Sequence, residues 1–336
     1  MSAVAAARAD AVTGALRGAG VLAGGEAVDA VEQLAGGWSR HTHLARAGAR
    51  RFVVRAQPPG ALLDTDLGLE HRTFAALEAT AIPAPRVHAF VATAETPFGG
   101  PFLVMEHVPG AAPDMYSRAD RAALAADWAG PRAVATDMVD NLARIHALAG
   151  DAMPRDLPAY AFDDVLARWR AAYEERALIR DPILEEAYAW VAERAPADAW
   201  PGLVHGDFRI GNTLVDGGRV RAVLDWELAY RGDVRFDLGY LAMARAAGKH
   251  LRMRSPLMGC FAEQEWFLER YAERTGRRCA PDDLRTFSML GIMMLLATQL
   301  TAVWMYAHRR TTDVRMAWSR WSFAGLRQDM AELMAW

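Results

Sequence analysis

The chain has 336 residues, 52% of them hydrophobic, so two lobes with separate cores and a cleft between them are expected. The formal net charge is −3 and no basic block is present, which argues against a nucleic-acid partner and against electrostatic docking to a membrane. The two cysteines, Cys260 and Cys279, are too few for a disulfide framework and lack metal-ligand spacing. We therefore expect reduced thiols in a cytoplasmic protein.

The N-terminal residues 1–26 are expected to form a short helix or a flexible extension. The segment is rich in alanine, but Arg8 and Asp10 interrupt it and no sustained apolar core is present. We therefore do not expect a signal peptide.

Alternating and β-branched residues predict strands within residues 27–55, with a tight turn at Gly48. Gly36 and Gly37 stand at the start of this hairpin. Glycines allow the backbone to approach a phosphate closely, although such a pair also marks an ordinary turn. The last strand of this region ends at Arg55, before the sequence QPPG.

Two further elements precede the expected lobe boundary. Residues 67–77 show the apolar spacing of a helix, with Glu70 on a neighbouring face. The sequence PFLVMEHVPG, residues 101–110, indicates a buried strand that runs into a connector stopped by Pro109. The chain is therefore predicted to divide near Pro109.

Helices are predicted over residues 132–148 and 163–194, the second interrupted at residues 181–182 by Asp-Pro. His146, near the end of the first, is expected to pack beneath the functional site and not to act as a ligand. Near the C-terminus four tryptophans are expected in the core, with an apolar acceptor pocket as the alternative. They are Trp304, Trp318, Trp321 and Trp336.

The segment 286–307 has no charged residue over about 22 positions, which is long enough to span a bilayer. Polar residues such as Ser288, Gln299 and Thr301 punctuate it. We therefore expect no membrane association.

The most informative part of the chain is residues 205–240, HGDFRIGNTLVDGGRVRAVLDWELAYRGDVRFDLGY. Asp207 stands five residues before Asn212, and an apolar run then ends on Asp225. A hairpin with this layout brings two acids and one amide together, as phosphoryl transfer requires. Asp207 supplies a carboxylate to orient the acceptor hydroxyl, while Asn212 and Asp225 supply oxygen ligands for Mg²⁺ on the nucleotide phosphates.

The order H-x-D-x-x-x-x-N, followed by a strand and an acid, also occurs in protein kinases. Here the middle residue is Gly206, the second acid lies in LDWE at residues 224–227, and GDVRFDLGY follows at 232–240. These features resemble the aminoglycoside phosphotransferase and choline kinase-like family, which are small-molecule kinases with a protein-kinase-like fold. With VVRAQPPG, LVMEHVPG and ERYAERTG, they resemble in particular the phosphotransferase domains found alone in bacteria or fused to acyl-CoA dehydrogenases.

The resemblance implies an α+β, bilobal, protein-kinase-like fold. A small antiparallel-sheet N-lobe is expected over residues 27–109, and a larger, mainly helical C-lobe over residues 110–336.

For the nucleotide, the resemblance implies that Gly36, Gly37 and Ser39 belong to the phosphate-covering loop, with Arg40 as a further match in position. Arg55 stands where protein kinases have a lysine that holds the phosphates. Glu70 is its expected partner, with a solvated helix glutamate as the alternative. The hinge that presents backbone groups to the adenine edge is expected to include Met105, Glu106 and Val108.

Within the motif, Asp207 is the expected catalytic base and His205 is expected to hold the loop by hydrogen bonds. Arg209 lies on the acceptor side, where it either neutralises a substrate carboxylate or phosphate or only pairs with Asp233 or Asp237. These two acids are expected to brace the loop through backbone N–H groups.

The predicted function is therefore an ATP- or GTP-dependent, Mg²⁺-requiring phosphotransferase that acts on a hydroxyl of a small molecule. The alternative is a catalytically silent, kinase-like nucleotide-binding module, suggested by Arg55 in place of lysine. Arginines mixed with aromatic residues over 252–320 slightly favour an anionic or apolar acceptor. The subgroup implies a hydroxylated metabolite, with an acyl-CoA-type molecule among the candidates.

Overall fold

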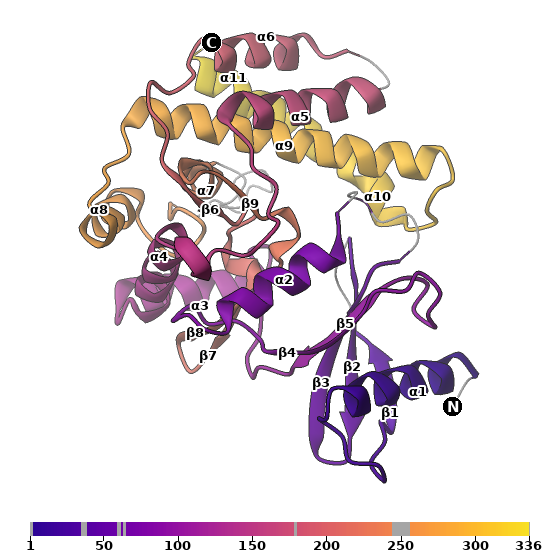
Figure 1. The fold of residues 1–336 in the computed structure, drawn as a ribbon. Coiled ribbons are helices and arrows are strands. Elements are labelled where there is room, and N and C mark those ends of the chain that lie inside the picture. The colour runs from indigo at the N-terminus through magenta and orange to yellow at the C-terminus, as the bar shows by residue number, and fades with distance from the viewer. Residues whose placement is uncertain are drawn as a thin grey trace. The chain divides into compact units, whose positions relative to one another are not determined.

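The computed structural model describes residues 3–34, 39–58, 62, 65–177, 180–243 and 256–335. The chain divides into two compact units, one made of residues 1–109 with 154–156 and the other of residues 110–153 with 157–336. An antiparallel sheet dominates the first unit, and helices dominate the second (Figure 1). The predicted α+β class, with a smaller sheet-containing part followed by a larger helical part, is confirmed.

The first unit consists of a five-stranded sheet and two helices. Its elements are α1 (Ala3–Gly18), β1 (Ala30–Gln33), β2 (His41–Ala47), β3 (Arg50–Ala56), α2 (Leu67–Leu77), β4 (Val87–Val91) and β5 (Phe102–Glu106). The strands pair antiparallel in the order β1-β2-β3-β5-β4.

Helices α1 and α2 cover opposite faces of this sheet. Successive side chains of a strand point to opposite faces. On β3, Val54 joins the core formed with Val12 and Leu16 of α1, whereas the next residue, Arg55, pairs with Glu70 of α2. The alternating side chains of β3 therefore contribute to an apolar core on one face of the sheet and to a buried ion pair on the other face.

The N-terminal helix α1 is an integral part of the first unit. Val12 and Leu16 are fully buried in the sheet core, and Arg8 donates from Nε to the carbonyl oxygen of Pro97. The buried area of these apolar side chains stabilises the helix against the sheet. Of the expected short helix or flexible extension over residues 1–26, the structure shows the helix, which packs against the sheet as part of the first unit.

The second unit contains most of the helices and two short strand pairs. Its main elements are α3 (Arg118–Ala129), α4 (Ala133–His146), α5 (Phe162–Arg176), α6 (Pro182–Ala192), β6 (Pro201–Val204), β7 (Thr213–Asp216), β8 (Arg219–Val223), β9 (Tyr230–Asp233), α7 (Arg235–Ala242), α8 (Gln264–Thr275), α9 (Pro281–Ala307), α10 (Val314–Trp318) and α11 (Phe323–Met334). Asp181 accepts from the backbone N–H groups of Ile183 and Leu184, so the predicted Asp-Pro break is the N-cap of α6.

Helix α9 forms the centre of the second unit, where it packs against α5, α6, α7 and α11 (Figure 1). It is long and apolar enough to cross a bilayer, but 78% of its most apolar window is buried within the protein. A helix that is hydrophobic on all sides is typical of such a central position. The apolar run is accounted for by packing against the neighbouring helices.

The C-terminal tryptophans do not form a common core stripe. Trp318 and Trp321 are 67% and 75% exposed. Trp304 is partly buried, with its ring stacked on His308, and Trp336 lies outside the described residues. The prediction of core packing is wrong for Trp318 and Trp321, because they lie on short helical turns that leave their rings in solvent. The alternative of pocket lining stays a prediction.

Candidate active site

Asn212 and Asp225 lie at the same end of the β7–β8 hairpin. Thr213 of β7 pairs with Val223 of β8, and just beyond this pair the backbone N–H of Leu224 donates to the carbonyl oxygen of Asn212 at 2.8 Å. Asp225 follows directly. The strand register thus brings together the amide and the second acid of the predicted site, thirteen positions apart in the sequence.

The carboxylate of Asp207 accepts hydrogen bonds from three side chains. Asn212 Nδ2 donates to Oδ2 at 2.7 Å, Arg209 Nε lies 3.2 Å from Oδ1, and the hydroxyl of Tyr240 donates to Oδ1. Asn212 Nδ2 also donates to the backbone carbonyl of Asp207 at 2.9 Å. These donors hold the carboxylate in one orientation.

The loop that carries Asp207 is held from behind by Asp237. The two oxygens of this fully buried carboxylate accept from the backbone N–H groups of His205, at 2.8 Å, and Gly206, at 2.9 Å. His146 Nε2 lies 3.1 Å from Asp237 Oδ2, and its Nδ1 bonds the hydroxyl of Tyr271. Both the bracing role of Asp237 and the packing of His146 beneath the loop agree with the predictions.

Asp233 does not brace this loop. Its carboxylate accepts from Trp200 N and from the backbone and guanidinium of Arg235. Arg235, which is 1% exposed, also bonds Asp198 and Asp283. The prediction for Asp233 is therefore wrong: it belongs to a buried charge network around Arg235.

Gly206 is required by the geometry of the loop. Its φ angle is +85°, and a Cβ atom there would lie 2.6 Å from the carbonyl oxygen of Leu228. Only glycine adopts such a conformation readily and allows so close an approach. The middle residue of HGD therefore brings the catalytic loop against the segment that follows Asp225.

Asp225 itself has a left-handed backbone conformation, with φ +68° and ψ +58°. Such conformations are uncommon for residues other than glycine and cluster at functional sites. The next residue, Trp226, is fully buried with its ring centroid 4.4 Å from that of His205. His205 Nε2 in turn lies 2.9 Å from the carbonyl oxygen of Leu224, so the histidine links the two halves of the site.

Arg209 pairs with Asp207, and its predicted alternative partners Asp233 and Asp237 bind elsewhere. Burial of its guanidinium would lower the pKa, but the charges of Asp207, Tyr240 and Asp225 outweigh this effect and raise the pKa of Arg209 above its ordinary value. The side chain keeps 34% of its surface exposed. A permanent cation therefore stands beside both acids with one face open to a substrate.

Tyr240 is the functional candidate that sequence reasoning missed. Asp237 and Tyr240 are three residues apart on α7, so both side chains lie on the same helix face and reach the same loop. Gly239, which lies between them, allows α7 to pack closely against α9, because a Cβ atom at this position would lie only 2.4 Å from the backbone of Phe287. The spacing D-x-x-Y within GDVRFDLGY was the available signal.

In the first unit, Arg55 Nε lies 2.9 Å from Glu70 Oε1, so the predicted ion pair is present. Glu70 is fully buried, which contradicts the alternative of a solvated glutamate. Arg40 shares the same acid, with Nε 3.8 Å from Oε2, and donates from Nη2 to Thr65 Oγ1 at 2.8 Å. Two buried or nearly buried arginines thus converge on one carboxylate.

The other nucleotide candidates are placed as follows. Gly36 and Gly37 lie outside the described residues, and Ser39 is partly buried in a bend. Met105 and Glu106 end β5, and the backbone N–H of Glu106 donates to the carbonyl of Arg86 at 2.8 Å. Val108, in the connector that follows β5, is partly buried. Binding roles for these residues remain predictions.

The donor set of the hairpin suits Mg²⁺. This ion takes oxygen ligands, usually one or two from carboxylates, and leaves its other positions to water and phosphate. Asn212 and Asp225 supply one amide and one carboxylate at the same end of the hairpin. No group of three or more His, Cys, Asp or Glu suited to a metal occurs among the described residues, and a Mg²⁺ site completed by nucleotide phosphates does not need one.

Comparisons with known proteins agree with this geometry. The phosphotransferase enzyme family matches the chain over residues 30–278. Acyl-CoA dehydrogenase family member 10 of Mus musculus is 29% identical over 243 residues, which cover 68% of this chain and 21% of that protein. The chain thus spans about a fifth of the length of this curated relative.

Solved structures of similar fold are phosphotransferases. A putative aminoglycoside phosphotransferase from Ralstonia eutropha has a TM-score of 0.74 at 22% identity, and the match covers 93% of both chains. A thermostable mutant of aminoglycoside phosphotransferase APH(4)-Ia, in ternary complex with ADP and hygromycin B, has a TM-score of 0.60 at 16% identity and covers 91% of this chain and 94% of that one. At such identities the likeness establishes the fold, and the predicted kinase-like fold is confirmed.

Proposed function

Because the chain belongs to the phosphotransferase enzyme family, we propose that it is an ATP- or GTP-dependent kinase that transfers the γ-phosphoryl group to a hydroxyl of a small molecule with the aid of Mg²⁺. The convergence of Asp207, Asn212 and Asp225 carries this proposal. Asn212 connects the acids, since it donates to Asp207 and stands beside Asp225 at the end of the hairpin. A phosphoryl-transfer site needs these three groups together.

Asp207 orients the acceptor hydroxyl and accepts its proton. The acceptor oxygen forms a bond to the γ-phosphorus as the bond from that phosphorus to the bridging β,γ-oxygen breaks, and the nucleoside diphosphate leaves. Arg209, a permanent cation beside Asp207, offsets negative charge that develops on the transferred group or is carried by the acceptor. Mg²⁺ held by Asn212 and Asp225 would neutralise the nucleotide phosphates.

Nucleotide binding is supported by the related APH(4)-Ia structure, which contains ADP with hygromycin B. We assign the nucleotide-binding role to residues of the first unit that match the family pattern. They are Gly36, Gly37, Ser39, Arg55, Glu70, Met105, Glu106 and Val108. The choice between ATP and GTP and the cytoplasmic location stay predictions.

The decisive variant is Asp207→Asn, which keeps the size of the side chain but cannot accept the acceptor proton. We expect phosphate transfer to fall by about 100-fold or more while nucleotide binding is retained. Isothermal titration with MgATP and MgGTP measures binding, and transfer of radiolabelled γ-phosphate to a panel of hydroxyl compounds measures turnover. Asp216→Asn, an exposed change at the far end of the same hairpin, is the matched control.

The magnesium role is tested separately with Asp225→Asn. Loss of the carboxylate ligand should raise the Mg²⁺ concentration needed for half-maximal nucleotide binding and leave the fold intact. Equal transfer by wild type and Asp207→Asn would overturn the role of Asp207. Tight nucleotide binding with no transfer to any acceptor class would favour the silent binding module instead.

A further inference from the structure

The sequence ERYAERTG, residues 269–276, lies on α8 and outside the catalytic motif. Its aromatic residue, Tyr271, is 1% exposed, and the hydroxyl lies 2.7 Å from Nδ1 of His146 on α4. The two rings meet edge to face, with their centroids 5.6 Å apart. A buried hydroxyl costs free energy unless it is hydrogen-bonded, so this contact holds the tyrosine side chain on the histidine.

Two arginines of the same sequence hold α8 against α4. Arg270 and Arg274 stand on either side of Tyr271 in the sequence, and the Nε and Nη2 groups of both donate to the carboxylate of Asp140 at 2.9–3.0 Å. Charge-assisted contacts in which both nitrogens of a guanidinium engage one carboxylate fix geometry as well as add binding energy. Asp140 therefore fixes the position of α8 on α4, and with it the place of Tyr271 beside His146.

The direction of each hydrogen bond follows from the groups that meet at His146. Its Nε2 faces Oδ2 of Asp237, which already accepts from the backbone, so the imidazole proton is assigned to Nε2. In a neutral imidazole Nδ1 is then the acceptor, and it receives the hydroxyl proton of Tyr271. Burial raises the pKa of this hydroxyl, which therefore keeps the proton that it donates.

The resulting relay of Tyr271, His146 and Asp237 ends on the catalytic loop. The two oxygens of Asp237 accept from the backbone N–H groups of His205 and Gly206. Hydrogen bonds that follow one another in a buried, low-dielectric environment strengthen each other. The donor at Tyr271 thus supports the bond from His146 to the carboxylate that holds the loop.

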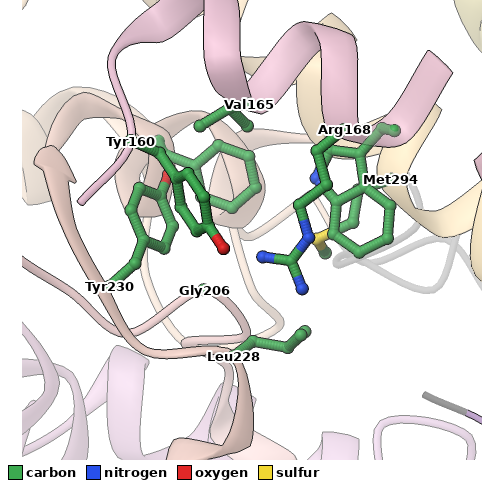
Figure 2. Close-up of a pocket in the computed structure, with 9 residues that line it drawn as sticks. Tyr160, Val165, Arg168, Gly206, Leu228, Tyr230 and Met294 are labelled. Carbon is green, nitrogen blue, oxygen red and sulfur yellow. The ribbon is translucent and has the colours of Figure 1, made fainter. Parts of the chain in front are cut away.

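The described residues on the other side of Gly206 offer the loop no comparable acceptor. Gly206 forms part of the wall of a small pocket, and Figure 2 shows it beside Leu228 and Tyr230. No carboxylate is found among the described lining residues, and Arg168, which carries the one charge in this lining, cannot accept a hydrogen bond. The position of the loop backbone therefore depends on Asp237 and on the groups that orient it.

We propose that Tyr271 is a positioning residue for phosphoryl transfer, which acts through His146 and Asp237 on the backbone of the catalytic loop. This inference rests on the kinase function proposed above, since the same loop carries the proposed base Asp207. It gives the sequence ERYAERTG a role in the reaction: the arginines fix α8, and the tyrosine completes the relay.

The first test is Tyr271→Phe, which removes the hydroxyl and keeps the buried ring. We expect kcat to fall about 10-fold while the KM for MgATP changes less than about 2-fold, because the relay ends on the loop of the proposed base. Titration with MgATP counts the nucleotide-binding sites, and kcat is expressed per site, so a lower yield of folded protein does not imitate the effect. A wild-type kcat in this variant would overturn the positioning role.

The matched control is Tyr188→Phe. Tyr188 is also buried, and its hydroxyl has no hydrogen-bond partner among the described residues. This variant removes a buried hydroxyl without breaking a hydrogen bond of the relay, so it should keep the wild-type kcat. A loss equal to that of Tyr271→Phe would show that any buried hydroxyl has this effect.

The second test reads the relay directly. Long-range ¹H–¹⁵N spectra of protein with labelled histidine show which imidazole nitrogen carries the proton, and the signal lost in His146→Phe identifies His146. We expect the proton on Nε2 in wild type and a shifted Nδ1 signal in Tyr271→Phe, but not in Tyr188→Phe. A proton on Nδ1 in wild type, or an unmoved signal in Tyr271→Phe, would overturn the relay.

The third test asks whether Tyr271 acts through His146. In the His146→Phe background the relay is already broken, so adding Tyr271→Phe should lower kcat less than about 2-fold further. A second loss of about 10-fold would show that Tyr271 acts by another route.

The relay and the kinase function fail in different ways. Hydrogen exchange of the backbone N–H groups of His205 and Gly206 needs no turnover, and we expect it to be about 10-fold faster in Tyr271→Phe. If wild type transfers no phosphate to any acceptor, the kinase function fails, while the His146 spectrum and the exchange rates still decide whether Tyr271 holds the loop. Unchanged exchange at both groups would contradict the positioning role alone.

Discussion

The hydroxyl of Tyr240 donates a hydrogen bond to Oδ1 of Asp207, the proposed base, from a position 33 residues further along the chain. One turn earlier on the same helix, Asp237 accepts from the backbone of His205 and Gly206. Helix α7 therefore positions both the main chain and the carboxylate of the catalytic loop. This arrangement gives Tyr240 a positioning role that can be measured.

Tyr240→Phe removes one donor from the Asp207 carboxylate and keeps the buried ring. Without this donor the carboxylate is less firmly oriented toward the acceptor hydroxyl, so kcat should fall about 3- to 10-fold while nucleotide binding is unchanged. Steady-state kinetics and titration with MgATP measure the two effects. Tyr188→Phe is the control, since the Tyr188 hydroxyl is buried with no hydrogen-bond partner in the described residues. A wild-type kcat in Tyr240→Phe would remove the positioning role.

Asp237→Asn should impair both the loop and the stability of the second unit. The Asp237 carboxylate now accepts from His146 Nε2 and from the backbone N–H groups of His205 and Gly206. An asparagine has only one oxygen, and its NH₂ group would face at least one of these three donors. That buried donor would then have no acceptor. We expect a loss of about 1–3 kcal/mol in the free energy of unfolding and a lower kcat. Urea titration and steady-state kinetics check the two effects. Asp216→Asn is again the control, and wild-type stability in Asp237→Asn would contradict the bracing role.

Glu70→Gln should destabilise the first unit strongly. It removes the carboxylate that pairs with both Arg40 and Arg55, whose side chains are 2% and 13% exposed. Removing one partner of a buried ion pair costs about 3–5 kcal/mol. In the exposed control Glu78→Gln we expect a change of about 0.5 kcal/mol or less.

A second variant separates the charge effect from packing around Glu70. Adding Arg40→Met to Glu70→Gln removes one of the two cations that pair with Glu70, so it should recover part of the lost free energy of unfolding. Urea titration of the two single variants and the double variant measures the coupling. Additive losses would show that Arg40 and Glu70 do not interact energetically.

The stability of the first unit should fall as the solution is acidified below pH 6.5. Burial, together with the nearby charges of Arg8 and His41, lowers the pKa of His43 to about 4. Between pH 6.5 and pH 4 the unfolded chain therefore binds a proton that the folded chain does not, so acid favours unfolding across this window. The full contribution is present above pH 6.5, and about 3 kcal/mol is lost by pH 4.

His43→Gln removes this titration and should flatten the dependence of unfolding free energy on pH in that window. Urea titrations at several pH values between 4 and 7 provide the measurement, with the exposed His308→Gln as control. A dependence as steep as in wild type would show that other groups account for the acid sensitivity.

Local spacing was a sufficient guide wherever pairing partners are near in sequence. The hairpin that brings Asn212 to Asp225 follows from an apolar strand on each side of a Gly-Gly turn, because antiparallel register places the two strand ends together. The helix predicted over residues 67–77 matches α2, where Asp66 caps the first turn. The same local reasoning failed for Trp318 and Trp321. The spacing of apolar residues in the sequence does not reveal whether another element packs over their side chains.

The sequence by itself determined the family, the order of the elements and the residue types that can perform phosphoryl transfer, because these depend on short-range periodicity and on a motif that is contiguous in the chain. Only the tertiary structure decided that Tyr240 reaches Asp207 and that Arg40 shares Glu70 with Arg55. Periodicity tells which face of a helix is buried. It does not tell which element packs against that face. This depends on how elements that are distant in sequence fit together in three dimensions, and therefore on the shapes of all the packed elements.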